Sequence, residues 1–190
     1  MNRKIITVAL LILVAAGITT ASSFTTATLT RDTNIDVVSD SKGVIALVDG
    51  NSGDIVKEDS SSGELRIDFG TIGSAEGVNV DSVYELGDPN DPSTRAFNIT
   101  NQDGVSHTIE LNYTITGTTS SVVGTAHNAT EFQVYRSDGS HVVTVSEDDS
   151  GASFSLGSGE SVAVVVVVDS TDSDVDQADD LSGTFEVTAT

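Results

Sequence analysis

Apolar and polar residues alternate with a period of two over much of this chain. The clearest runs are residues 65–69, 109–115, 132–134 and 185–187. Alternation of β-branched and aromatic residues with polar ones predicts strands that are buried on one face. Residues 162–168 are nearly all valine, a pattern typical of a strand that is buried on both faces or covered by a partner.

Glycine and short polar residues separate these runs, for example at 49–53, 101–104 and 157–159. Such clusters are turn formers, and many short strands at this spacing predict an all-β domain. We expect residues 22–190 to form a single domain, a jelly-roll-like antiparallel β-sandwich. Only residues 118–130 lack a clear alternation, so a loop or short helix is expected there.

The N-terminal residues have the layout of an export signal. Arg3 and Lys4 precede a mostly apolar stretch at 5–18, and small residues follow it. This order predicts a secretory signal peptide over residues 1–21 and a mature chain that begins near Ser22. The stretch is shorter than the roughly 20 apolar residues that span a bilayer. We therefore expect an extracellular or cell-surface protein with no membrane attachment after cleavage.

The chain is strongly acidic, with 8 Lys and Arg residues against 29 Asp and Glu residues and a formal net charge of −21. A polyanion repels nucleic acid and anionic lipid, so neither is an expected partner. At molar salt the Debye length falls to about 3 Å and carboxylates repel one another weakly. The composition is typical of a halophilic archaeal protein, and an acidic secreted protein from a moderate-salt organism is the alternative. Because cysteine is absent, stability must come from the core.

No catalytic constellation stands out in the sequence. His107, His127 and His141 lack the spacing of zinc ligands. The Gly157–Gly159 turn lacks the GxSxG pattern of a nucleophile elbow. We expect a non-enzymatic protein with no cofactor.

The best metal candidate is an acidic segment near the C-terminus. Asp172, Asp174 and Asp176 place oxygen ligands two residues apart, which suits calcium. The spacing fails the EF-hand pattern, because Gln177 stands where Gly is needed and Gly183 where the bidentate Glu belongs. A solvated acidic hairpin loop is the alternative.

Three N-glycosylation sequons begin at Asn98, Asn112 and Asn128. Alternation places Asn98 and Asn112 on the polar face of their strands, where modification is sterically feasible. Sequons also arise by chance in a Thr-rich sequence, so unmodified asparagines are the alternative.

Several segments resemble the camelysin/TasA-type secreted fibre proteins and related uncharacterised haloarchaeal secreted proteins. The small residues leading into Ser23-Phe-Thr-Thr-Ala-Thr-Leu-Thr-Arg-Asp32 resemble their signal-peptide exit. Asn34-Ile-Asp-Val-Val38 and Gly43-Val-Ile-Ala-Leu-Val48 resemble their first strands. Arg95-Ala-Phe-Asn-Ile-Thr-Asn101 and His107-Thr-Ile-Glu-Leu-Asn112 resemble their paired core strands. Leu156-Gly-Ser-Gly-Glu-Ser-Val162 resembles a turn that opens a late strand, with Ser158 in place of the usual proline.

The resemblance implies a jelly-roll subunit that polymerises outside the cell when an N-terminal strand completes the sheet of a neighbour. Residues 22–38 are the candidate donor strand, and an ordinary intramolecular first strand is the alternative. The candidate assembly residues are Phe24, Ala27, Leu29, Ile35 and Val37. Four of them, Ala27, Leu29, Ile35 and Val37, lie at odd positions, interrupted by Arg31, whereas Phe24 falls in the other frame.

We therefore expect a structural protein, the subunit of a pilus-like or biofilm-matrix filament. Its partners would be copies of itself and other surface proteins. The alternative is a monomeric secreted or envelope-associated binding or adhesion module. Because the chain has 6 Phe, 3 Tyr and no Trp, platforms for carbohydrate stacking are scarce, which favours the filament.

Overall fold

The computed structural model describes residues 37–71, 76–117, 128–147, 150–171, 175–177 and 179–190. All of them belong to Val37–Thr190, one of the two units into which the chain divides. The expected signal peptide and most of the candidate donor strand lie outside the described residues.

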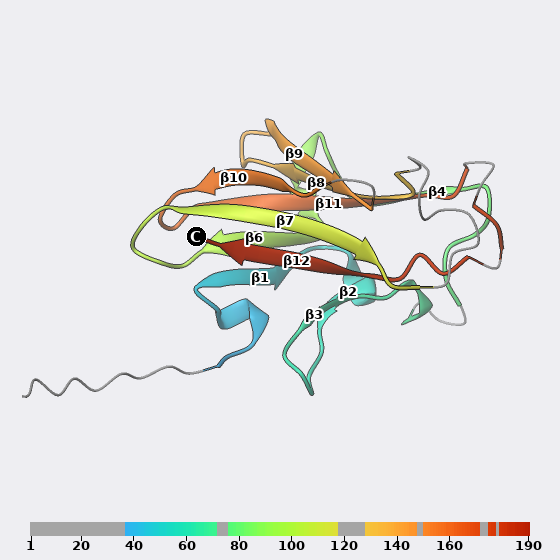
Figure 1. The fold of residues 1–190 in the computed structure, drawn as a ribbon, viewed down its shortest axis with the longest axis horizontal. Helices are drawn as coiled ribbons and strands as arrows, with labels where there is room; N and C mark the ends of the chain where they lie inside the picture. The colour runs from blue at the N-terminus through green and yellow to red at the C-terminus, as the bar shows by residue number, and fades with distance from the viewer. Residues whose placement is uncertain (1–36, 72–75, 118–127, 148–149, 172–174, 178) are drawn as a thin grey trace, which may run out of the picture. The chain divides into compact units, whose positions relative to one another are not determined.

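The described part of the chain is built from β-strands and short 3-10 helices (Figure 1). The strands are β1 (Ile45–Asp49), β2 (Val56–Glu58), β3 (Leu65–Ile67), β4 (Val83–Asp88), β5 (Asp91–Arg95), β6 (Phe97–Asn101), β7 (His107–Ile115), β8 (Thr130–Tyr135), β9 (His141–Ser146), β10 (Ala152–Leu156), β11 (Ser161–Asp169) and β12 (Gly183–Ala189). The 3-10 helices are η1 (Asp40–Lys42), η2 (Gly53–Ile55) and η3 (Phe69–Thr71). A seven-stranded sheet contains β1, β4–β6, β8, β9 and β11, a three-stranded sheet has the order β10-β7-β12, and β2 and β3 form a hairpin.

The valine-rich strand β11 is the centre of the large sheet. One of its edges pairs with β8, and the other pairs first with β6 and then with β4, all antiparallel. Its residues 162–166 are all buried, so both faces of the strand are covered. The expectation of a strand buried on both faces is confirmed.

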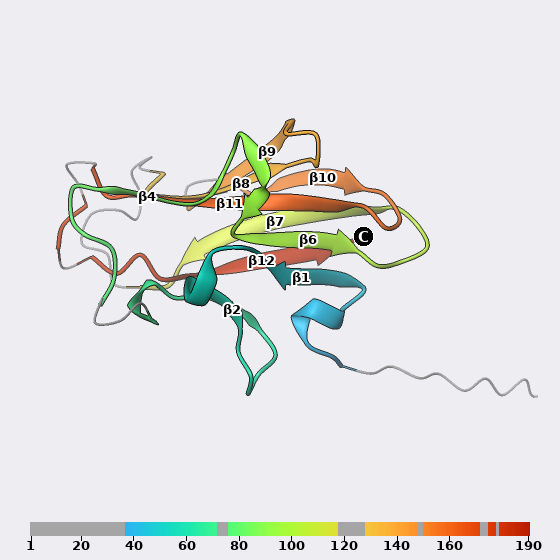
Figure 2. The same ribbon diagram turned by 180° about the vertical axis from the view of Figure 1, so that it is seen from behind.

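Strands β4 and β6 lie one after the other along the same edge of β11 (Figures 1 and 2). Leu86 of β4 is opposite Val166, and Phe97 of β6 is opposite Val164. Residues 87–95 between them leave this edge with the β4–β5 hairpin, and Ala96 N donates to Val164 O of β11 at 2.9 Å. A loop secures the base of the hairpin, where Gly50 N donates to Ala96 O at 2.8 Å.

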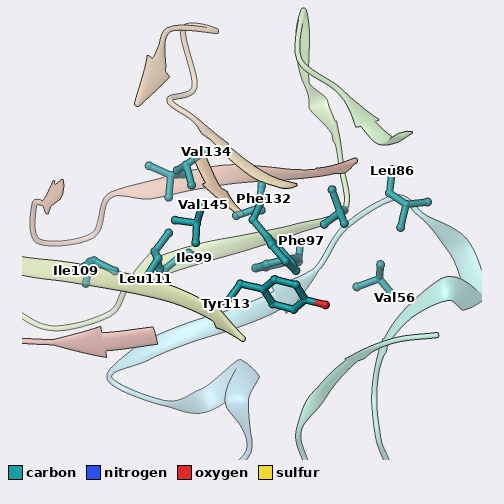
Figure 3. Packing of buried hydrophobic residues seen from close by; sticks show 14 of the residues in the cluster. Val56, Leu86, Phe97, Ile99, Ile109, Leu111, Tyr113, Phe132, Val134 and Val145 are labelled. Atoms are coloured by element: carbon teal, nitrogen blue, oxygen red, sulfur yellow. The ribbon is translucent and has the colours of Figure 1, made fainter. Parts of the chain in front are cut away.

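The core lies between the two larger sheets. Ile109, Leu111 and Tyr113 of β7 are buried, as the alternation predicts. Figure 3 shows Tyr113 beside Phe97 and Phe132, which come from the opposite sheet. The Tyr113 and Phe132 rings have centroids 5.0 Å apart, within the range of favourable aromatic pairs.

The all-β antiparallel architecture and the strands at 109–115, 132–134 and 185–187 are confirmed. One strand boundary is wrong, because the strand expected over 65–69 ends at Ile67 and Phe69 begins η3. Its ring packs edge-on against Tyr84, with centroids 6.0 Å apart, so packing overrides the local alternation. The described end of the expected first strand, Val37 and Val38, is not in a strand. Residues 118–127 of the expected loop lie outside the described residues.

Candidate assembly surface

Strands β1 and β12 each form the edge of a sheet on the same side of the sandwich, called the open side below, and η1 and the β2–β3 hairpin contact β1 there. Within the described residues β1 pairs only with β6, and β12 pairs only with β7. Phe185 of β12 reaches Phe97 of β6 with ring centroids 5.8 Å apart, so the free edge of the small sheet lies over the part of the large sheet that β1 completes. Both views of the fold place β1 and β12 along the same side (Figures 1 and 2).

Core residues on this side are incompletely covered. Ile45 and Leu47 on β1, and Phe185 and Val187 on β12, pack against the core but remain half-buried. On the opposite side, strands β9 and β10 contact each other. The open side therefore combines unpaired backbone N–H and C=O groups with a strip of apolar side chains. This combination is what a sheet edge offers to an added strand.

Asn101 joins the two sheets at one end of the sandwich. Its side chain is fully buried, and its Nδ2 donates to the carbonyl oxygens of Val105, Leu156 and Gly157 at 2.8, 3.1 and 3.1 Å. Its Oδ1 accepts from Asp103 N at 2.9 Å. The amide thus ties the β6–β7 loop to the turn between β10 and β11, and it holds the ends of both sheets together.

Asp103 carries a second polar contact in this corner. His107 Nε2 and Asp103 Oδ2 are 2.7 Å apart, and hydrogen bonding to this imidazole is the main reason why the pKa of Asp103 lies below its ordinary value. The histidine therefore acts in a local contact within the loop. His141 lies on the surface with Nε2 at 2.9 Å from Thr144 Oγ1, and His127 lies outside the described residues.

Tyr113 fixes the segment that leads into β12 at the other end of the core. Its hydroxyl donates to Leu181 O at 2.7 Å. Burial raises the pKa of Tyr113 to about 12, so the hydroxyl stays protonated and keeps donating at any physiological pH. This bond positions the start of the free edge strand.

The acidic segment is anchored by an apolar residue. Val175 is buried against Ala129 in a small cluster beside the main core, whereas Asp176 is exposed. Asp172 and Asp174, the other calcium candidates, lie outside the described residues. Within the described ranges, no group of three or more His, Cys, Asp or Glu side chains could hold a metal ion.

The assembly and modification candidates have the following places. Phe24, Ala27, Leu29 and Ile35 lie outside the described residues, and Val37 is 99% exposed. Asn98 and Asn112 lie within β6 and β7 on the outward faces of their sheets, and Asn128 precedes β8.

No protein-family model matches this chain, and a search of the curated proteins found no match. Among the described residues, no helix has the length and apolarity needed to cross a bilayer. The chain's own geometry therefore carries the functional argument.

Asn101 is a structural residue that the sequence analysis missed. It occupies the same frame as Phe97 and Ile99, which are both buried. An asparagine in the apolar frame of a strand is a usable signal, because a buried polar side chain needs hydrogen-bond partners. Its partners Leu156 and Gly157 are far away in the sequence, so the alternation could not identify them.

Proposed function

We propose that this protein is a non-enzymatic, secreted cell-surface structural protein. It is the subunit of an extracellular pilus-like or biofilm-matrix filament, with a jelly-roll-like sandwich that is extended by strand donation. The single observation that carries the proposal is the open side between β1 and β12, where half-buried core residues meet unpaired strand edges. Residues 22–38 of a neighbouring copy would supply the added strand.

The physical argument for donation is complementarity between edge and segment. An added strand satisfies backbone groups that otherwise face water and covers apolar surface at about 25 cal/mol per Å². The candidate segment has four apolar residues in one frame, Ala27, Leu29, Ile35 and Val37, and Arg31 interrupts them. A strand in this register would therefore present one apolar face to the strip of half-buried residues.

The distribution of carboxylates favours a contact between subunits along a strand edge over a contact across a whole face. The strands β1 and β12 each contain a single carboxylate, Asp49 and Glu186. A chain with a net charge of −21 repels itself over most of its surface, and the repulsion weakens as salt is added. Contact along β12 brings few carboxylates together, whereas Asp40 of η1 and the carboxylates of the β2–β3 hairpin belong to elements that contact β1.

Deletion of residues 22–33 tests the proposal. The mature protein with and without this segment is run on size exclusion in molar salt over a range of concentrations. We expect polymers that grow with concentration in the parent and a monomer in the deletion variant. A parent that is a sharp monomer, with a melting temperature unchanged by the deletion, contradicts the proposal and favours a monomeric binding module.

Disulfide trapping locates the contact, because the chain has no native cysteine. Leu29→Cys combined with Val187→Cys, on the half-buried face of the edge strand β12, should give covalent ladders under oxidation in molar salt. Leu29→Cys combined with Ser140→Cys, in the turn before β9, is the matched control and should give none. Equal ladders in both pairs would show that the cross-links arise from random collision.

A further inference from the structure

The three sequons differ sharply in what surrounds them in the folded protein. Modification of a sequon involves the Asn amide and the Thr hydroxyl two residues later. In an extended strand these two side chains point to the same face, because successive side chains alternate. A sequon in a folded strand is therefore accessible only when that face is open and neither group is already engaged.

The Asn98 sequon lies within the large sheet. Asn98 is half-buried on β6, which pairs with β1 on one edge and β11 on the other. Its direct cross-strand neighbours are Val48 and Ala163. Thr100 Oγ1 lies 2.9 Å from Ser161 Oγ. The strand is flanked on both edges, and the hydroxyl of the sequon is already hydrogen-bonded.

The Asn128 sequon is blocked in a different way. Asn128 itself is exposed, but its backbone has a φ of 40° and its Oδ1 accepts a hydrogen bond from Ser146 Oγ at 2.8 Å. Thr130 is only 5% exposed and begins the paired strand β8. The hydroxyl of this sequon therefore lies inside the fold, out of reach of a modifying enzyme.

The Asn112 sequon is open. Asn112 is half-buried, as Asn98 is, but Thr114 is exposed, and Tyr113 between the two residues points into the core. Within the described residues no hydrogen bond engages the side chain of Asn112 or Thr114. Only β12 flanks this part of β7, because the pairing of β10 with β7 ends at Leu111.

The surrounding face has room for a large substituent. The outward side chains around the sequon on β7, β10 and β12 are small or flexible and nearly all exposed: Thr108, Glu110, Ser153, Ser155, Thr184, Glu186 and Thr188. The outward-facing positions of this sheet thus carry no aromatic and no aliphatic side chain.

We propose that Asn112 is the N-glycosylated residue of this protein and that its glycan covers the outer face of the three-stranded sheet. Asn98 and Asn128 stay unmodified in the folded chain. The inference rests on the proposed export, since N-glycosylation requires passage across the membrane. It also restricts assembly, because a face that carries a glycan is not a contact between subunits, whereas the β1 and β12 edges remain available.

Site occupancy is measured by mass spectrometry. The full chain is secreted from a host with N-linked glycosylation, and its glycopeptides are mapped. We expect a glycan on the peptide that contains Asn112 and none on the other two sequons. Asn112→Gln and Thr114→Ala should both remove the mass increase, whereas Thr114→Ser, Asn98→Gln and Asn128→Gln should retain it.

The N-terminus of the same sample separates two ways of failing. A secreted chain that lacks residues 1–21 and carries no glycan on Asn112 overturns this inference and leaves export standing. A glycan on Asn98 or Asn128 with Asn112 unmodified overturns it as well. A chain that stays in the cell with its leader intact overturns both the export and the glycosylation.

Discussion

Replacement of Asn101 by alanine should destabilise the sandwich more than any comparable change on its surface. The side chain has 0% exposure and takes part in four hydrogen bonds, three donated by Nδ2 and one accepted by Oδ1. Truncation leaves these backbone partners without the amide, at the junction between the β6–β7 loop and the β10–β11 turn.

The magnitude follows from the number of bonds. A typical intramolecular hydrogen bond contributes about 0.5–1.5 kcal/mol net, and a buried group left unsatisfied costs about 1–3 kcal/mol. Nδ2 has two hydrogens for three acceptors, so the three donated contacts count as about two bonds. We expect a loss of about 2–4 kcal/mol. For a domain of this size that corresponds to a fall in melting temperature of roughly 4–16 °C.

Thermal and urea unfolding in molar salt, followed by circular dichroism, measure this loss. Asn101→Asp is the second variant: it keeps the size of the side chain but turns a carboxylate towards three carbonyl oxygens, so it should lose at least as much. Thr100→Ala is the matched control, because it removes one surface hydrogen bond and should cost less than about 1 kcal/mol. If Asn101→Ala unfolds within about 0.5 kcal/mol of the parent, the amide does not join the sheets.

Three further changes test other parts of the structure. Gly50→Ala places a Cβ 2.1 Å from the carbonyl oxygen of Arg95 in β5 and should lower the stability by about 1–3 kcal/mol. Gly104→Ala is the control: no atom lies within 4 Å of its added Cβ, so its melting temperature should be nearly unchanged. Phe185→Ala removes a ring whose centroid lies 4.3 Å from that of Phe132. It should cost about 2–4 kcal/mol of stability, since truncation of a fully buried Phe costs about 3–5 kcal/mol and this ring is only half-buried. An unchanged melting temperature would mean that the free edge strand contributes nothing to the core. Ser140→Ala should raise the pKa of Asp138 towards its ordinary value without reaching it, because the backbone bond at 2.9 Å remains. Since the folded-state pKa lies below that value, the contribution of this turn is present above about pH 4 and is lost as the pH falls; NMR titration of the carboxyl checks it.

The period-two pattern was enough to predict the strands, because the buried face of a strand is encoded by residues that are neighbours in the sequence. In β7 the residues Ile109, Leu111 and Tyr113 are buried, and the alternation of apolar and polar residues alone predicts which side chains these are. The valine run of β11 likewise indicated burial on both faces. Phe69 was misplaced because its position depends on a contact with Tyr84, which is distant in sequence and is not part of any local pattern.

The interrupted strand made by β4 and β6 could not be predicted for a related reason. Residues 87–95 leave the edge of β11 as a hairpin whose base is held by Gly50 and Asn51. The turn residues around Pro89 indicate a turn, but nothing in them shows that the flanking strands share one edge of a third strand. The open side between β1 and β12 belongs to the same class, because it is defined by which strands have only one partner.

The acidic residues of this chain build its turns as well as its surface. In several turns an Asp Oδ1 accepts both the backbone N–H and the side-chain hydroxyl of the residue two positions later, at 2.6–3.0 Å: Asp59 with Ser61, Asp91 with Ser93, Asp138 with Ser140 and Asp169 with Thr171. These bonds favour the charged form and lower the pKa of Asp59, Asp91 and Asp138. The charge is thus held where the chain reverses direction.

This arrangement has a consequence for assembly. The turn carboxylates lie between strands, with Asp59 in the β2–β3 hairpin, whereas β12 carries Glu186 as its one charge. Repulsion between two copies is then weaker along the free edge of β12 than where turn carboxylates of both copies meet. At molar concentration, added salt screens the repulsion between carboxylates over distances beyond about 3 Å, but hydrogen bonds made by an incoming strand are shorter-ranged and survive it. A filament built through β1 and β12 should therefore form in molar salt and loosen as the salt is removed by dialysis. Filaments that persist unchanged in low salt would show that this repulsion does not oppose their assembly.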